Sequence, residues 1–257
     1  MNVQPGRSKN VEKITVHILQ SNQQVGQKAA EDFATKLSTA IANKGEAAAI
    51  LATGNSMLTF FEALRARRDI AWDKVNLFHM DEYLGMSDQH PASFPNYIRK
   101  NLTNHVTPKA FYPIKGDVSD VQSELRRYDE LLRKYPADIC VLGIGENGHL
   151  AFNDPPANFA TRDLIHVVTL DEECRMQQVH EGHFKTIDDV PKRAITLTIP
   201  ALLNAKYVLA VVPEARKAAA VKKALEGPVT PNCPGSILRT RPNVTMYLDE
   251  ESASKLT

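Results

Sequence analysis

Short runs of apolar and β-branched residues alternate with segments of helical periodicity along almost the whole chain, and this alternation constrains the fold most. The longer segments repeat apolar residues every three or four positions, as amphipathic helices do. Strands that alternate with helices form a mainly parallel sheet with helices on both faces. The sequence therefore predicts one doubly wound, Rossmann-like α/β domain over residues 1–257. The expected strands are residues 14–19, 47–51, 75–79, 138–144, 165–170, 194–198, 207–212 and 244–248, and the expected helices are 25–43, 57–68, 120–135 and 215–226.

The charge and cysteine content argue against several classes of function. The 257 residues include 31 Lys and Arg against 30 Asp and Glu, so a net charge of +1 gives no general attraction to nucleic acid or anionic lipid. Three scattered cysteines, Cys140, Cys174 and Cys233, match neither a disulfide framework nor a zinc motif. No apolar run is long enough to span a membrane, and residues 1–13 lack a signal-peptide pattern. We expect a cytoplasmic protein without nucleic-acid or membrane partners. The sequence leaves open whether it forms a homo-oligomer.

Ligands of doubly wound sheets bind beyond the carboxyl ends of the strands, and a polar loop follows the expected strand 47–51. This loop, Thr53-Gly54-Asn55-Ser56, leads directly into the expected helix 57–68. Free backbone N–H groups at a helix start and hydroxyl side chains suit a phosphate. The same residue types also cap ordinary helices, which is the alternative interpretation. The loop is no P-loop, because it lacks the lysine and the longer glycine spacing.

Two carboxylates, Asp81 and Glu82, follow the expected strand 75–79. A carboxylate at a partly desolvated strand end can have a raised pKa and act as a base toward a C–H or O–H group. A surface turn or a helix cap is the alternative.

A glycine-rich loop, residues 143–149, follows the expected strand 138–144 and matches the spacing G-x-G-x-x-G. A dinucleotide site would need a long helix beginning at these glycines, and Pro155 and Pro156 interrupt such a helix. We therefore expect no nucleotide here. The loop instead presents His149 with Asp154 five residues later, a pair suited to moving protons near neutral pH. A structural histidine is the alternative.

The polar segment 171–189 is a candidate lid, within a wider region 156–190. Within it, the run His180-Glu181-Gly182-His183 could suggest a metal site, but no third ligand is apparent beside the two histidines. We expect this four-residue run to be solvated and to bind no metal.

Together, these segments resemble the glucosamine-6-phosphate deaminase family, which shares a superfamily with the 6-phosphogluconolactonases. The resemblance runs from about Ile14 to Leu256. Each segment is common alone, whereas their order and separation are specific. The segments that carry it are Thr53–Ser56, Met80–Tyr83, Gly143–His149, Phe152–Pro155, Leu170–Arg175 and Lys217–Gly227.

The resemblance implies a role for each matching residue. Asp81 would be the base that moves a proton between C2 and C1 of the opened sugar, and His149 would catalyse ring opening. Asp154 would orient His149, with Asn147 beside it in the catalytic group. No cofactor is implied. The positions that match phosphate-binding residues are Gly54, Asn55, Ser56, Arg175 and Lys217.

Two residues depart from the family pattern, and rival functions stay open. Asp154 stands where Glu is usual and is one methylene group shorter, and Asn147 stands where some members have Asp. The first rivals are the same chemistry on galactosamine-6-phosphate or another hexosamine phosphate, and hydrolysis of 6-phosphogluconolactone. A non-catalytic sugar-phosphate sensor and a dinucleotide enzyme are the others. The segments 80–83 and 152–155 favour the deaminase.

Overall fold

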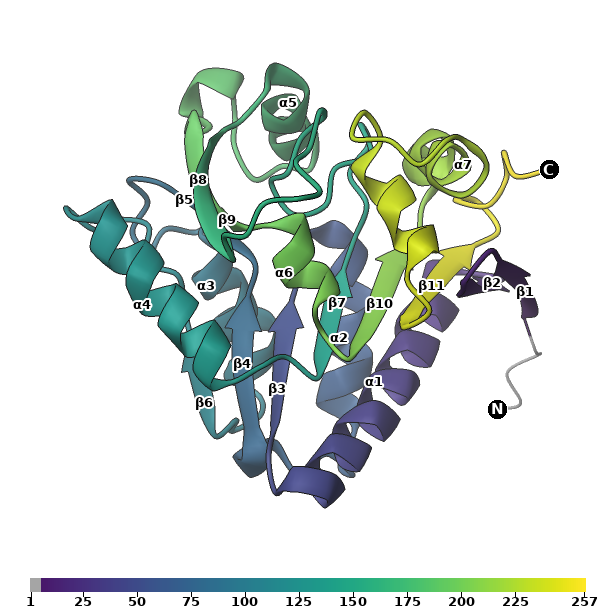
Figure 1. Cartoon of the computed structure of the whole chain (residues 1–257), viewed down its shortest axis with the longest axis horizontal. Coiled ribbons are helices and arrows are strands. Elements are labelled where there is room, and N and C mark those ends of the chain that lie inside the picture. Colours follow the sequence, from purple (N-terminus) through teal and green to yellow (C-terminus); the bar gives the residue numbers. More distant parts are fainter. Residues whose placement is uncertain (1–5) are drawn as a thin grey trace.

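A mostly parallel sheet forms the centre of the computed structural model, which describes residues 6–257 (Figure 1). The first five residues of the polar N-terminal stretch lie outside this range. The sheet has eight strands in the order β1-β2-β11-β10-β7-β3-β4-β6, and only β1 runs antiparallel to its neighbour. The strands are β1 (Arg7–Val11), β2 (Ile14–Leu19), β3 (Ala47–Leu51), β4 (Val75–His79), β6 (Ala110–Tyr112), β7 (Ile139–Leu142), β10 (Tyr207–Val212) and β11 (Val244–Asp249).

Helices cover this sheet, as the alternating pattern predicts. All residues of β3 and β4 are buried, because the sheet is covered on both faces. The helices are α1 (Asn22–Lys44), α2 (Leu58–Ala66), α3 (Phe94–Ile98), α4 (Val121–Lys134), α5 (Glu172–His180), α6 (Ile199–Leu203) and α7 (Ala218–Glu226). Short segments of other helix types are η1 (Asn55–Met57), η2 (Trp72–Lys74), η3 (Arg99–Thr103), η4 (Ile187–Asp189), η5 (Ala215–Lys217) and η6 (Pro234–Thr240). The predicted α/β fold and its four longer helices are confirmed.

The longest helix shows how the local sequence sets these bounds. The Ser21 side chain caps the start of α1 by accepting a hydrogen bond from the Gln24 N–H. The helix ends at Gly45, which adopts the left-handed conformation with φ of 83°. A Cβ at Gly26 would lie 2.4 Å from the backbone of Thr59, so glycine lets α1 pack closely against α2.

A second, antiparallel sheet was not predicted. It has three strands in the order β5-β9-β8, namely β5 (Asp81–Tyr83), β9 (Arg193–Leu197) and β8 (Ile165–Thr169). The segments predicted as strands at 165–170 and 194–198 are strands, but they belong to this sheet and not to the parallel one. An apolar run marks a strand without selecting its partner, which is the physical reason for the difference.

The second sheet lies with α5 beyond the carboxyl ends of β3, β4 and β7 (Figure 1). Tyr83, Phe94 and Phe152 form a small apolar cluster there, with ring centroids of neighbouring rings 5.0–5.7 Å apart. This cluster anchors α5 over the edge of the large sheet through the buried Cys174. Among residues 6–257, no helix is both long and apolar enough to cross a bilayer.

Candidate active site

A cavity of about 90 Å³ lies where the loops after β3, β4, β7 and β10 meet. The chain leaves β3 toward β4 and leaves β7 toward β10, so the crevice between β3 and β7 is the topological switch point at which such sheets bind ligands. The three polar loops expected at strand ends therefore come together. Candidate residues in its lining are Gly54, Asn55, Ser56, Asp81, His149 and Lys217.

The loop after β3 forms one end of the cavity. Gly54 has φ of +97°, a conformation that side chains rarely adopt, and it precedes η1, which continues into α2. Its carbonyl accepts a hydrogen bond of 2.7 Å from the Tyr97 hydroxyl, which fixes the loop. Asn55 and Ser56 occupy the first turn, where backbone N–H groups lack helical partners. This end is suited to an anion.

Asp81 lies at the other side of the cavity, just after β4. Its side chain is buried and has no hydrogen-bond partner among residues 6–257, and burial raises its pKa to about 8. A carboxylate in this state is a competent base near neutral pH.

Glu82 is bound differently from its neighbour. Its two carboxylate oxygens accept hydrogen bonds from the N–H groups of Tyr83 and Phe94, at 2.7 and 3.1 Å. Burial raises the pKa of Glu82 to about 9, although these two bonds favour the charged form. Glu82 therefore organises the backbone, and Asp81 is the carboxylate that is free to react.

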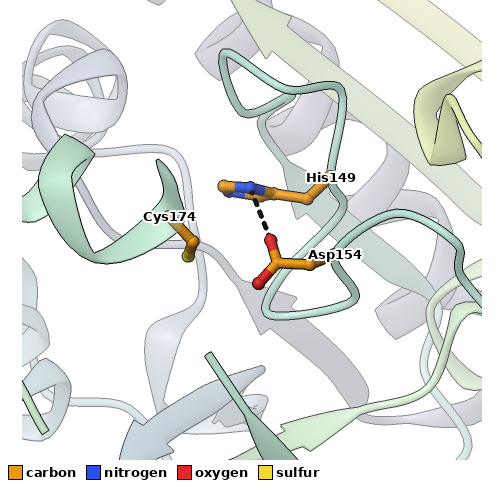
Figure 2. Close-up of side chains that lie close together, drawn as sticks. All are labelled: His149, Asp154 and Cys174. Carbon is orange, nitrogen blue, oxygen red and sulfur yellow. Dashed lines mark ion pairs between the residues drawn. The ribbon is translucent and has the colours of Figure 1, made fainter. Parts of the chain in front are cut away.

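His149 and Asp154 form a pair, as Figure 2 shows. Nδ1 of His149 lies 3.2 Å from Oδ1 of Asp154, an ion-pair distance at which the ring N–H is not yet aligned as a hydrogen bond. Such contacts often tighten only when substrate binds. Burial would raise the pKa of Asp154, but the neighbouring imidazole of His149 and the hydrogen bonds from the Asn147 side chain and the Asp171 N–H lower it. The shorter aspartate side chain thus still reaches the histidine.

The glycines of the loop after β7 make room for His149. A Cβ on Gly145 would lie 2.3 Å from the imidazole ring, and Gly148 has φ of +92°. No helix begins at these glycines, because the next helix is α5. The G-x-G-x-x-G spacing therefore serves the histidine and does not form a dinucleotide fingerprint.

Asn147 forms hydrogen bonds with both members of the His149–Asp154 pair. Its Oδ1 accepts a hydrogen bond of 3.0 Å from the His149 N–H, and its Nδ2 donates to Oδ1 of Asp154 at 3.2 Å. Asn147 is not among the residues that line the cavity. Its contacts are therefore with the members of the pair and not with the cavity, which is the geometry of a positioning residue.

Cys174 of α5 lies beside the pair (Figure 2). The side chains of His149, Asp154 and Cys174 bring metal-ligand atoms within 4.8 Å of one another, a set that the sequence did not suggest. A thiol binds metal as a thiolate, but burial and the nearby carboxylates hold the pKa of Cys174 well above its usual value. We interpret His149 and Asp154 as a proton-transfer pair and build no step on a metal at this set.

The structure does not bring Arg175 to the site. Its guanidinium donates hydrogen bonds to the carbonyl oxygens of Ile187 and Val190, and it does not line the cavity. The structure therefore places the Arg175 guanidinium outside the cavity in which it was expected to bind phosphate. A long side chain can extend to either side of a helix, so sequence position alone did not decide where its head group binds.

Lys217, at the end of η5, does line the cavity and is buried. Burial and the charge of Arg216 lower its pKa. It is the one lysine or arginine among the described residues that line this cavity.

The segment 180–183 was expected to be solvated: His180 and Gly182 are exposed, but the side chain of Glu181 is not. Its carboxylate is buried and lines the cavity, 2.7 Å from Nη1 of Arg216 and 3.3 Å from Nε2 of His183. Burial would raise the pKa of Glu181, but hydrogen bonds from His183 and Arg216 and the charge of Lys217 lower it to about 2. Sequence reasoning missed Arg216, and its position next to Lys217 was the available signal.

A protein-family model described as "Glucosamine-6-phosphate isomerases/6-phosphogluconolactonase" matches residues 20–247. The chain belongs to this family. It is 36% identical over 206 residues to a glucosamine-6-phosphate deaminase from Streptococcus uberis, with 80% of this chain and 86% of that protein covered. A glucosamine-6-phosphate deaminase from Exiguobacterium sibiricum is 39% identical over 207 residues, with 80% of each chain covered.

Solved structures agree with this membership in the glucosamine-6-phosphate isomerase/6-phosphogluconolactonase family. A monomeric glucosamine-6-phosphate deaminase superposes with a TM-score of 0.86 and 33% identity, over 93% of this chain and 98% of that one. A 6-phosphogluconolactonase from Shewanella baltica superposes with a TM-score of 0.76 and 21% identity, over 94% of this chain and 98% of that one. The second likeness supports the fold alone. Because the family includes two reaction classes, the residues of the site decide between them.

Proposed function

We propose that this protein converts glucosamine-6-phosphate to fructose-6-phosphate and ammonia. The observation that carries the proposal is that one cavity presents a buried, unpaired carboxylate at Asp81 and a histidine–carboxylate pair at His149 and Asp154. Two separate proton-transfer groups match a reaction with two separate proton transfers. Similarity to proteins named glucosamine-6-phosphate deaminase supports the same choice.

His149 acts first, on the closed sugar ring. Its ring passes a proton between the anomeric hydroxyl and the ring oxygen, which opens the pyranose to the aldehyde. Asp154 stabilises the imidazolium that forms in between and fixes which nitrogen faces the sugar.

Asp81 acts on the open chain. Its carboxylate removes the proton from C2 while the aldehyde oxygen at C1 takes up a proton, which gives an enolamine. Asp81 then returns its proton to C1, and the nitrogen releases one N–H proton that balances the proton taken up by the oxygen. The amine at C2 becomes an imine, water adds to that carbon, and the C–N bond breaks. One sugar phosphate and one water thus give one fructose-6-phosphate and one ammonia.

The other end of the cavity binds the phosphate. The N–H groups and hydroxyl at Gly54, Asn55 and Ser56 donate to its oxygens, and Lys217 supplies positive charge. This arrangement holds C1 and C2 of the sugar at the Asp81 side.

The segment 156–190 forms a lid in this proposal, because α5 supplies Gln177 and Gln178 to the cavity lining. The reaction takes place in the cytoplasm, in keeping with three free, buried cysteines. The proposal assigns every site residue to one chain, and a homo-oligomer of such chains is compatible with it.

The experiment offers the purified protein three substrates in parallel: glucosamine-6-phosphate, galactosamine-6-phosphate and 6-phosphogluconolactone. Ammonia and ketose phosphate are measured for the first two, and acid release for the lactone. We expect equal amounts of ammonia and fructose-6-phosphate from the first substrate, at a kcat/KM at least tenfold above the second. Faster lactone hydrolysis would instead assign the chain to the lactonase activity.

A further inference from the structure

A cluster of charged groups at the phosphate end of the cavity has no part in the chemistry above. Arg216 contacts three carboxylates, with Nη1 2.7 Å from Glu181 and 3.1 Å from Glu146, and Nε 2.6 Å from Glu214. These carboxylates come from the end of α5, the glycine-rich loop and the residue before η5. Three segments far apart in the sequence therefore converge on one guanidinium.

Glu181 lies between this guanidinium and the loop after β3. One carboxylate oxygen accepts hydrogen bonds from Arg216 and, at 2.8 Å, from Gln177. The other oxygen is 3.7 Å from the position that a Cβ on Gly54 would take. The Glu181 backbone carbonyl also accepts a hydrogen bond of 3.3 Å from the Asn55 side chain. A carboxylate thus occupies the space beside the loop that binds phosphate.

The charges at this end are not arranged for a free anion. The three carboxylates of Glu146, Glu181 and Glu214 outnumber the lysine and arginine that face them, Lys217 and Arg216, and His183 also contacts Glu181 at 3.3 Å. The cavity of about 90 Å³ is also smaller than the roughly 300–1,000 Å³ of typical small-molecule sites. If Glu181 left, the excess of negative charge at this end would fall and the cavity would become larger.

We infer that Glu181 fills the phosphate subsite as an internal anion in the unliganded protein, and that Arg216 is the guanidinium that the substrate's phosphate takes over when Glu181 leaves. The inference rests on the proposed function for the identity of the phosphate ester. Carboxylate and phosphate use the same donors, and arginine binds either with two parallel hydrogen bonds. Arg216 is not among the residues that line the cavity, because Glu181 lies between its guanidinium and the loop 53–56, and it would face the phosphate only after Glu181 leaves. Glu181 and Arg216 therefore set the affinity for the phosphate group.

The backbone around Glu181 permits this exchange. Glu181 is the residue at which α5 ends, and Gly182 follows with φ of +80° and with open space, free of other atoms within 4 Å, where a Cβ would be. A glycine in this conformation joins the helix to the following segment without packing restraints. A small rotation here would carry the carboxylate out of the cavity.

The test measures binding of inorganic phosphate by isothermal titration calorimetry, without turnover. We expect Glu181→Gln to bind phosphate about tenfold more tightly than the parent protein, and Arg216→Gln to bind it at least tenfold more weakly. Glu214→Gln is the matched control: it removes a charge from the same guanidinium but not from the cavity. Its affinity should change less than that of Glu181→Gln.

Hydrogen exchange of the unaltered protein gives a second readout that does not depend on a variant's folding. Phosphate should increase exchange at residues 177–183, because it replaces the carboxylate that holds them. Equal or weaker phosphate binding by folded Glu181→Gln, or slower exchange at 177–183 on adding phosphate, would overturn the inference. Failure to release ammonia from any hexosamine phosphate, with both phosphate results as expected, would overturn the proposed reaction alone.

Discussion

The imidazole of His149 packs directly over the backbone of Gly145, so closely that a Cβ there would lie 2.3 Å from the ring. The same loop returns a hydrogen bond of 3.0 Å from the Gly145 N–H to the His149 carbonyl. The ring is therefore held from one side by the glycine and from another by Asp154 at 3.2 Å. This double restraint fixes the orientation of the histidine before substrate arrives, and it makes the pair testable from either side.

Replacing Gly145 with alanine should displace the ring. We expect kcat to fall by about 10²–10⁴, the contribution of a general acid–base group, because the added methyl and the imidazole cannot occupy the same space. Gly143→Ala is the matched control in the same loop, since its Cβ would meet its nearest atoms at 3.7 Å. Steady-state kinetics of both variants checks this. Equal losses would show that any substitution in the loop is harmful.

Replacing Asp154 with asparagine should remove the charge that stabilises protonated His149. We expect kcat to fall by roughly 10–100-fold, less than the loss of the acid–base group itself. Asp154→Glu restores the residue usual in the family and should keep most of the activity. Glu173→Gln, at an exposed position, is the control for loss of a carboxylate. An Asp154→Asn variant with the same kcat as this control would contradict the assigned role of the pair.

The activity of the free enzyme should rise with pH. Asp81 must be ionised to accept a proton, and burial raises its pKa to about 8. The protonated, inactive form therefore dominates below that value, and kcat/KM should increase through about pH 8 instead of levelling off near the ordinary pKa of about 4. A pH profile of kcat/KM measures this directly. A flat profile from about pH 6 to about pH 8 would show that Asp81 is ionised throughout.

The two candidate phosphate cations should behave differently. Lys217→Gln should raise KM by about tenfold to a hundredfold, the loss of a charge-assisted hydrogen bond of ~1.5–3 kcal/mol, because Lys217 lines the cavity. Arg175→Gln should leave KM within about twofold, because its guanidinium binds the carbonyls of Ile187 and Val190. Arg175→Gln should instead lower the stability of the segment 171–189, because it removes these hydrogen bonds. The reverse order of KM values would restore Arg175 to the phosphate site.

Much of the fold could be predicted from the sequence. The strands 47–51 and 75–79 match β3 and β4 to the residue, because β3 is a continuous apolar run and β4 is apolar at three of its five positions, as in fully buried parallel strands. The second sheet could not be predicted, since β5 has only three residues, Asp81–Tyr83, and its partners β8 and β9 lie far along the chain. The helix α5 was also missed, because its polar sequence lacks a continuous apolar stripe.

The site, too, could be predicted only in part from the sequence. The loops after β3, β4 and β7 could be placed together, because parallel strands bring their carboxyl ends to one edge. The destinations of long charged side chains could not, since they depend on partners from other segments. Glu181 was expected in solvent and is buried against Arg216, whereas Arg175 was expected at the phosphate and binds backbone carbonyls.

The most direct test of the central claim is ammonia release from glucosamine-6-phosphate by the Asp81→Asn protein beside the unaltered one. The asparagine removes the base while keeping the shape of the side chain, and it removes a buried carboxyl group, so the melting temperature at about pH 8 should not fall. We expect stoichiometric ammonia and fructose-6-phosphate from the parent and at least a thousandfold slower release from the variant. A folded Asp81→Asn protein that keeps a tenth or more of the parent rate would contradict the role of Asp81 as the base.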